Sequence, residues 1–227
     1  MIKYIRKIQA SIKTFKINRT LSQFNKCGRG ITLMPPYSIA GAENIIIEDF
    51  VRIMPHSVFL ITGCKFIMKK YSAASYNFRV VATNHKPTVG VPIFFNNMLH
   101  INDVSKGDIV VGEDCWIGVN VTLLAGANLG RGSVVGANSL VNKEIPPYAV
   151  VVGSPAKIIA TKFTKEQILA HEEKLYPKEE RLSVEYLDEL FQKHYVGLKS
   201  IGTESMTDDE LSRLKAKYQE QNVNLNI

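Results

Sequence analysis

The sequence predicts a mainly β protein, a parallel solenoid of triangular coils with helices at both ends. Two observations support this prediction. A gap-free six-residue repeat starts at Val111, and weaker copies of the repeat precede it. A six-residue period fits neither the 3.6-residue period of a helix nor the 2.0-residue period of an ordinary strand. It fits a chain that turns a corner every six residues, so that three hexapeptides complete one coil of a triangular prism.

The repeat is clearest in the second half of the prism. It reads VGEDCW, IGVNVT, LLAGAN, LGRGSV, VGANSL, VNKEIP. The first position is always aliphatic, and we expect these side chains to fill the interior. Glycine recurs at the second position, as at Gly112 and Gly118, which indicates crowding or unusual dihedral angles near the corners. The fifth position is mostly small.

A weaker run precedes the clear repeat. It comprises Ile47, Ile53 and Phe59, with a further set expected around Ile67 and Tyr71. The two runs differ in register, because 64 positions separate Ile47 from Val111 and 64 is not a multiple of six. An insertion must therefore interrupt the coils, and residues 85–107 are the candidate. Loops that interrupt a solenoid often carry its function.

The repeats divide the chain into three parts. Residues 1–30 form a basic N-terminal segment, residues 31–160 form the prism with its inserted loop at about 85–107, and residues 161–227 form a C-terminal extension. Thr164 and Thr207 each begin a capping-box signature, and Ser183 is placed to cap a further helix. We expect the extension to be helical and to cover the open end of the solenoid or pack on a neighbour.

Composition excludes several classes of protein. Hydrophobic residues make up 45% of the 227 residues and charged residues 22%, which are ordinary globular values. No apolar run approaches the roughly 18 residues that span a bilayer, and no signal peptide is evident, so we expect a cytoplasmic protein. The three cysteines are widely spaced without a CxxC pair, which suggests neither a disulfide framework nor a structural zinc site.

The net charge of +7 is concentrated at the N-terminus. Residues 1–42 contain eight lysines and arginines and no acid. Apolar residues recur at helical spacing in the same segment, at Met1, Ile5, Ile8, Ile12 and Phe15. This pattern predicts an amphipathic helix that either docks on the protein with its cations in water or lies on an anionic membrane. Nucleic acid is not an expected partner, because the rest of the chain is nearly neutral.

The stretch GEDCWIGVNVTLLAGANLGRGSVVGANSLVNKEIPPYAVVVGSPAKI resembles the terminal coils of the hexapeptide-repeat acyltransferases, of the polysaccharide and sugar O-acetyltransferase type. The resemblance runs from roughly Ile39 to Ile159. It implies a left-handed parallel β-helix and a homotrimer with active sites at the subunit interfaces. It also implies acetyl-CoA as co-substrate, a saccharide acceptor, and a catalytic histidine at a loop that extends from the coils.

His85 is the expected general base. It follows Asn84 where the first repeat run gives way to the insertion, and the resemblance places the catalytic histidine there. A neutral imidazole suits the role because its pKa lies near working pH. The resemblance also places Asn84 and Trp116 in the active-site neighbourhood. His100 lies in the same loop and is not expected to act.

The expected contacts with coenzyme A come from the resemblance alone. They are Val119, Ala137, Asn142, Lys143 and Lys157. The two lysines suit the phosphates of the cofactor. Val119 stands where some relatives have a small polar residue, which leaves a backbone contact in place of a side-chain one, and Asn142 replaces a more usual threonine.

Several other functions are weighed against this one. Cys115 could form an acyl-enzyme, but its fifth-position slot favours a small buried wall residue. A xenobiotic or antibiotic acetyltransferase would use the same prism and histidine. A zinc hydratase would need three converging histidines, and His56, His85 and His100 lack the expected spacing, so no metal is expected. A non-enzymatic scaffold for glycan assembly at the inner membrane face is supported only by the basic N-terminal helix.

Overall fold

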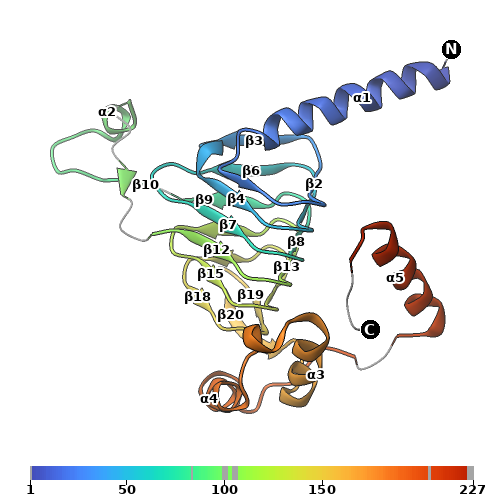
Figure 1. Cartoon of the computed structure of the whole chain (residues 1–227). Helices are drawn as coiled ribbons and strands as arrows, with labels where there is room; N and C mark the ends of the chain where they lie inside the picture. Colours follow the sequence, from blue (N-terminus) through green and yellow to red (C-terminus); the bar gives the residue numbers. More distant parts are fainter. Residues whose placement is uncertain (1, 83, 99–101, 104–106, 204–205, 224–227) are drawn as a thin grey trace.

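The computed structural model describes residues 2–82, 84–98, 102–103, 107–203 and 206–223. In that part of the chain, three parallel sheets form the faces of a triangular prism, a left-handed β-helix with helices at both ends (Figure 1). The expected fold class is confirmed. Successive coils stack along the prism axis, so each strand between the two ends pairs with strands of the coils above and below it.

Sheets A, B and C are the three faces. Within the described residues, sheet A contains β1 (Lys26–Cys27), β4 (Ile45–Ile47), β7 (Phe66–Met68), β12 (Ile109–Val111), β15 (Asn128–Leu129) and β18 (Glu144–Ile145). Sheet B contains β2 (Thr32–Leu33), β5 (Arg52–Ile53), β8 (Ala73–Ala74), β13 (Trp116–Ile117), β16 (Val134–Val135), β19 (Ala149–Val152) and β20 (Lys157–Thr161). Sheet C contains β3 (Tyr37–Ala40), β6 (Ser57–Leu60), β9 (Arg79–Val81), β14 (Thr122–Leu124) and β17 (Leu140–Val141).

The prism has three edges, at which the chain turns from one face to the next. We call them edge AB, edge BC and edge CA after the sheets that they join. A short 3-10 turn, Ala42–Asn44, lies at edge CA between β3 and β4. β20 departs from the parallel pattern, because it pairs antiparallel with β19 and so ends the solenoid.

Aliphatic side chains at the first repeat position fill the interior, as expected. Ile47, Ile53 and Phe59 are buried, and so are the first-position residues from Val111 to Val141. The expectation around Ile67 and Tyr71 was wrong. Met68, Ala74 and Val80 fill the third coil, whereas Ile67 faces outward on β7 and Tyr71 turns edge AB. The register shifts because nine positions, not six, separate Phe59 from Met68.

Glycines at the second position are required by crowding between coils. A Cβ on Gly130 would lie 2.4 Å from the backbone nitrogen of Pro147, and one on Gly112 would lie 2.7 Å from the carbonyl oxygen of Leu129. The left-handed backbone conformation occurs instead at the fourth position, where Asp114 has φ 54° and Asn120 has φ 60°. Asparagine and aspartate tolerate this conformation better than most residues do.

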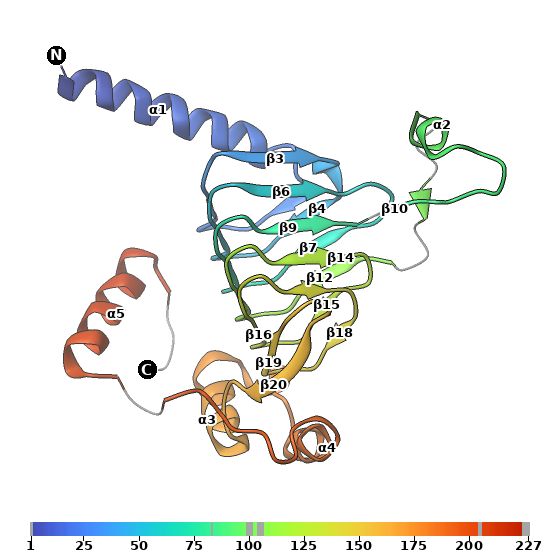
Figure 2. The same ribbon diagram turned by 180° about the vertical axis from the view of Figure 1, so that it is seen from behind.

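The N-terminal helix α1 (Ile2–Leu21) projects from the first coil (Figures 1 and 2). Near its C-terminal end, Ile17 and Leu21 pack against the core. Ile12 and Phe15 point elsewhere and are 50% and 68% exposed, so the part of the apolar stripe that is described does not dock on the prism of its own chain. None of the helices in the described part of the chain combines the length and apolar character needed to cross a bilayer.

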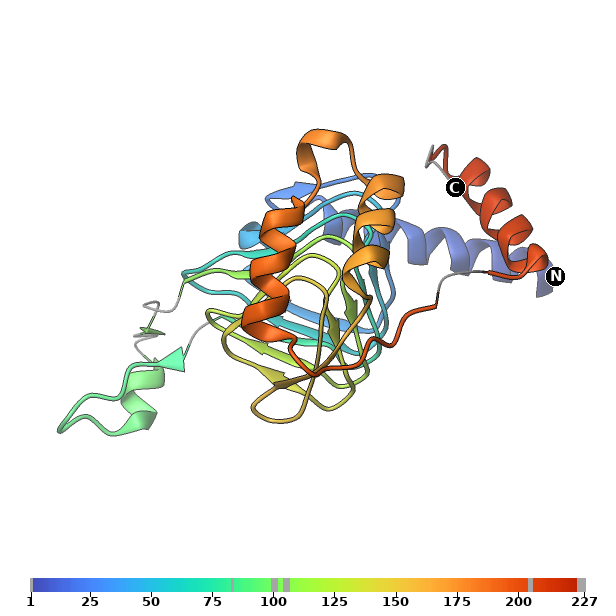
Figure 3. The same ribbon diagram turned by 90° about the horizontal axis from the view of Figure 1, so that it is seen from below.

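The C-terminal extension is helical, as predicted. It contains α3 (Lys165–Leu175), the short 3-10 helix Lys178–Glu180, α4 (Val184–His194) and α5 (Asp208–Glu220). Both predicted capping boxes form, at Thr164 and Thr207, and Ser183 caps α4. α3 and α4 lie across the C-terminal end of the prism (Figure 3). They therefore cover its last coil.

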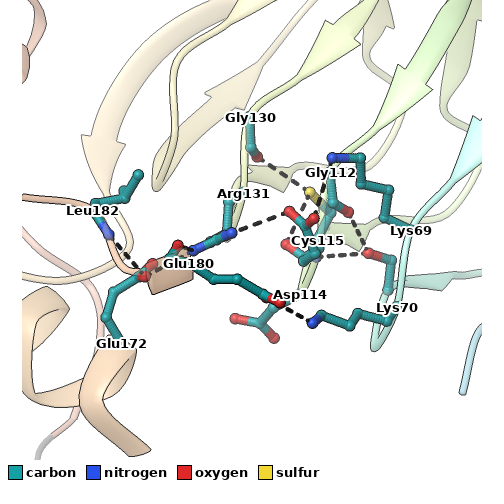
Figure 4. A network of polar contacts seen from close by, with 12 residues as sticks. Lys69, Lys70, Gly112, Asp114, Cys115, Gly130, Arg131, Glu172, Glu180 and Leu182 are labelled. Carbon is teal, nitrogen blue, oxygen red and sulfur yellow. Dashed lines mark hydrogen bonds and ion pairs between the residues drawn. The ribbon is translucent and has the colours of Figure 1, made fainter. Parts of the chain in front are cut away.

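A polar network fastens α3 to the prism near edge AB (Figure 4). Its centre is Glu172, which is 1% exposed. The carboxylate accepts hydrogen bonds from Arg131 Nη1 at 2.8 Å and from the backbone amide of Leu182 at 3.2 Å. Arg131 also pairs with Glu113 on the prism. The buried charge is thus paired, which makes the network a clamp between prism and extension.

Candidate functional site

The insertion leaves the prism at edge CA, between β9 and β12. It begins with β10 (Asn84–His85), which pairs antiparallel with β11 (Asn102–Asp103) and places His85 opposite Asn102. The helix α2 (Ile93–Met98) lies between these two strands in the sequence. The structure therefore presents His85 on a short two-stranded ribbon that stands out from the coils (Figure 1).

His85 is half-buried, and its Nδ1 atom is buried without a hydrogen-bond partner among the described residues. Asn96 on α2 contacts the residue that follows His85. Its side chain is 1% exposed, and its Nδ2 group donates to the carbonyl oxygen of Lys86, while its Oδ1 atom has no partner in the described part of the chain. An unpaired buried polar group costs about 1–3 kcal/mol. The loop therefore holds two unpaired buried polar atoms, one on the candidate base and one on Asn96.

Sequence reasoning missed Asn96. It stands at the end of the apolar run from Val91 to Phe95, and a polar side chain in such a position is the one signal that could have drawn attention to it. Its burial depends on how α2 folds back on Lys86, which no repeat spacing encodes.

The side chains of α2 that the structure describes present an apolar outer surface. Ile93, Phe94, Phe95 and Met98 are exposed. The rings of Phe94 and Phe95 meet edge to face with centroids 5.4 Å apart. Exposed aromatic side chains beside a candidate base form a surface on which a ring-shaped acceptor could pack.

Trp116 lies on a different part of the prism. It belongs to β13 of sheet B and is 49% exposed. β10 and sheet B lie on opposite sides of the prism in two views related by 180° (Figures 1 and 2). Within a single chain, the structure does not bring Trp116 to His85 and Asn84.

The expected coenzyme A contacts fall into two groups. Asn142 and Lys143 are exposed at edge CA, between β17 and β18, on the edge from which the insertion leaves. Val119 and Ala137 are exposed at edge BC on adjacent coils, where the carbonyl oxygen of Val119 accepts a 2.9 Å hydrogen bond from the amide of Asn138. Lys157 lies near this second group, because it pairs with Val152 at the end of β19. Sheet C separates the two groups.

Cys115 is a buried wall residue. Its thiol donates to the carbonyl oxygen of Gly130 at 3.3 Å and lies 3.4 Å from the Ser133 hydroxyl. Burial raises the pKa of the Cys115 thiol to about 11. The thiol is therefore protonated near neutral pH, where only the thiolate is a strong nucleophile. This environment does not suit an acyl-enzyme intermediate.

The other histidines lie elsewhere. His56 turns edge BC with φ 65° and is exposed. His171 on α3 contacts Asp114 Oδ2 at 3.1 Å, and His194 lies at the end of α4. His100 lies outside the described residues. In the part of the chain that the structure describes, no three His, Cys, Asp or Glu side chains converge as metal ligands do.

Comparison with known proteins identifies the family. Residues 108–143 match a model described as bacterial transferase hexapeptide, six repeats. The chain is 31% identical over 151 residues to a protein of Escherichia coli K12 assigned as the lipopolysaccharide biosynthesis O-acetyl transferase WbbJ, covering 66% of this chain and 67% of that protein. The chain belongs to the hexapeptide-repeat acyltransferase family.

Other members of this hexapeptide-repeat family are similar over different lengths. A chloramphenicol acetyltransferase of Agrobacterium fabrum is 44% identical over 145 residues, which cover 64% of this chain and 62% of that protein. The chain spans only about a third of the length of several further curated relatives. A solved hexapeptide-repeat acetyltransferase from Vibrio cholerae has the same fold, with a TM-score of 0.59 and 24% identity over 67% of this chain and 82% of that one.

Proposed function

We propose that the protein is an acetyl-CoA-dependent O-acetyltransferase that acts on a hydroxyl group of a saccharide, a precursor of surface or capsular polysaccharide. The observation that carries this proposal is the position of His85. In a prism of the hexapeptide-repeat family, this histidine begins the insertion that interrupts the coils at edge CA. The family resemblance places the general base at the same point.

The reaction needs few protein groups. The neutral His85 imidazole accepts the proton of the acceptor hydroxyl while the hydroxyl oxygen attacks the thioester carbonyl carbon of acetyl-CoA. The carbon–sulfur bond then breaks, and the imidazolium returns its proton to the departing sulfur, which leaves as the free thiol. Both substrates are bound at once, and the raised pKa of the buried Cys115 thiol favours this direct transfer over an acyl-enzyme.

A homotrimer would complete the site. His85 and Trp116 lie on opposite sides of one prism, and the expected coenzyme A contacts are divided between edges CA and BC. When three prisms pack side by side, one edge of each chain faces a different edge of its neighbour. We therefore place acetyl-CoA between adjacent prisms. Asn142 and Lys143 would come from one of them, and Val119, Ala137 and Lys157 from the other.

The acceptor class has one serious alternative. Similarity to a relative assigned to lipopolysaccharide biosynthesis supports a saccharide acceptor. Similarity to a chloramphenicol acetyltransferase, together with the exposed Phe94 and Phe95, favours a xenobiotic or antibiotic acceptor instead. The same base and the same prism would serve either reaction, because only the surface that holds the acceptor has to differ.

Release of free coenzyme A thiol separates these possibilities. The purified protein is incubated with acetyl-CoA and a panel of nucleotide sugars, lipid-linked oligosaccharides, phenicols and aminocyclitols. Acceptor-dependent release with saccharides alone supports the proposal, and release with the drugs alone supports the alternative. If calorimetry detects no binding of acetyl-CoA, the result supports a non-enzymatic scaffold. If the purified protein contains stoichiometric zinc, the result supports a zinc hydratase.

We also propose that α1 brings the enzyme to the inner face of the membrane. Residues 1–42 carry eight cations and no acid, and Ile12 and Phe15 are exposed. Ile17 and Leu21 anchor the helix through other positions, so the exposed residues stay available. Each cation near an anionic surface contributes about 1 kcal/mol, and three copies in a trimer would bind with avidity.

A further inference from the structure

The insertion contains a buried asparagine that the proposed mechanism does not use. Asn96 is 1% exposed, and its Nδ2 group donates to the carbonyl oxygen of Lys86. Lys86 directly follows His85 in the chain. The Asn96 amide is therefore held one residue along the chain from the imidazole of the proposed base.

His85 Nδ1 and Asn96 Oδ1 are complementary. Both atoms are buried, and neither has a hydrogen-bond partner within the described residues. A neutral imidazole donates from its protonated ring nitrogen, and an amide oxygen accepts. Buried polar atoms in native proteins are nearly always paired. An Nδ1 atom that carries the imidazole proton is a donor and Asn96 Oδ1 is an acceptor, so these two unpaired atoms in one small loop suit a pairing that forms when the site is occupied.

The tautomer of His85 gives this pairing its significance. A histidine that accepts a proton at Nε2 must carry its own proton on Nδ1, and the group that accepts the Nδ1 proton sets both the tautomer and the ring orientation. In the described part of the loop, Asn96 supplies a buried oxygen with no other partner. Thr88, by contrast, is exposed, and its hydroxyl donates to the Lys86 carbonyl at 3.3 Å.

We infer that Asn96 is the positioning residue for His85. Its Nδ2 group fixes the peptide that follows the histidine, and in the substrate complex its Oδ1 atom accepts the Nδ1 proton and leaves Nε2 free for the acceptor hydroxyl. This inference rests on the proposed function, because it assigns His85 the role of base. Asn96 itself touches no reacting atom.

Three variants test the inference by kinetics. Asn96→Ala is expected to lower kcat by about 10²-fold, the effect of a misplaced reacting group, with the KM for acetyl-CoA unchanged. Asn96→Asp keeps the size of the side chain and places a carboxylate beside Nδ1, which favours the imidazolium, so the rising limb of the kcat–pH profile is expected to move to higher pH. Thr88→Ala is the matched control and is expected to keep wild-type kcat.

The imidazole itself gives a readout that does not require turnover. In protein labelled with ¹⁵N-histidine and saturated with coenzyme A, the His85 signal is expected to report the Nδ1–H tautomer. Asn96→Ala is expected to convert it to a mixture of tautomers, which a purely structural role would not do. An unchanged tautomer, or a kcat within twofold of wild type, would overturn the inference.

Failure of the proposed function has a different signature. If His85→Ala retains wild-type turnover, His85 is not the base and the proposed mechanism fails. The tautomer of His85 in the Asn96 variants still reports whether Asn96 orients the imidazole. The two outcomes are therefore separable in the same set of proteins.

Discussion

Tyr148 Oη donates a 2.6 Å hydrogen bond to Oε1 of Glu172, and both residues are buried. The two residues join the last coil of the prism to α3. Glu172 also accepts from Arg131 Nη1 and the Leu182 amide (Figure 4), so its carboxylate accepts from one cation and two neutral donors. This arrangement explains how a polar helix can seal the end of the solenoid.

Loss of this hydrogen bond should loosen the extension. Tyr148→Phe keeps the ring but removes the donor to a buried carboxylate, and we expect a loss of about 1.5–3 kcal/mol in the free energy of unfolding. Urea denaturation measures it. Tyr186→Phe, at an exposed position on α4, is the control. Equal stability of the two variants would show that the hydrogen bond from Tyr148 to Glu172 contributes nothing.

The ion pair between Asp114 and Lys162 should make the stability of the fold depend on pH in the acid range. Burial opposes ionisation of Asp114, but the hydrogen bond from His171 and the charge of Lys162, 2.5 Å away, outweigh it and lower the pKa of this carboxyl. A lowered pKa stabilises the fold above the ordinary value of about 3.9, and this contribution disappears as pH falls through the lowered value. Asp114→Asn should therefore destabilise at pH 7 and much less at pH 2, as measured by Tm.

Substitution of His85 should lower the rate of the chemical step and leave substrate binding unchanged. His85→Ala is expected to lower kcat by about 10² to 10⁴-fold and to leave acetyl-CoA affinity nearly intact, because a general base acts during transfer. Steady-state kinetics and calorimetry measure the two quantities. His56→Asn, at an exposed corner that asparagine tolerates, should behave as wild type. Turnover by the His85 variant at the wild-type rate would contradict the assignment.

Cys115 should tolerate a smaller side chain and reject a larger one. Cys115→Ala is expected to keep activity, whereas Cys115→Leu should overfill the coil against Ser133 and lower the free energy of unfolding by about 1–3 kcal/mol. Denaturation and turnover are compared for both. Mass spectrometry of the enzyme quenched during turnover offers a further check, since an acetyl group on Cys115 would refute direct transfer.

The exposed stripe of α1 should bind anionic membranes. Full-length protein is expected to co-sediment with vesicles containing anionic lipid but not with neutral vesicles, and salt should weaken the binding. Phe15→Glu should reduce binding strongly, because Phe15 is exposed. The control Ser11→Thr should not, since Ser11 is already polar. Equal sedimentation of the wild type and the Phe15 variant would argue against membrane contact.

The sequence by itself determined the repeating parts of this protein. The spacing from Val111 to Val141 specified the interior of two coils, because each aliphatic residue has only one face of a turning chain on which to be buried. The caps at Thr164, Ser183 and Thr207 marked the helices of the extension, because a side-chain oxygen satisfies amides only a few residues away. These features depend only on residues that are close together in the sequence.

Only the tertiary structure decided what depends on distant segments. The nine-residue step from Phe59 to Met68 altered the register of the third coil, because the extra residues are accommodated at an edge. The folding of α2 onto Lys86 buried Asn96 beside His85, and stacking of the coils placed Trp116 on another side of the prism. The number of residues in the turn at each edge decides which side chains far apart in the sequence come together. The six-residue spacing does not encode that number.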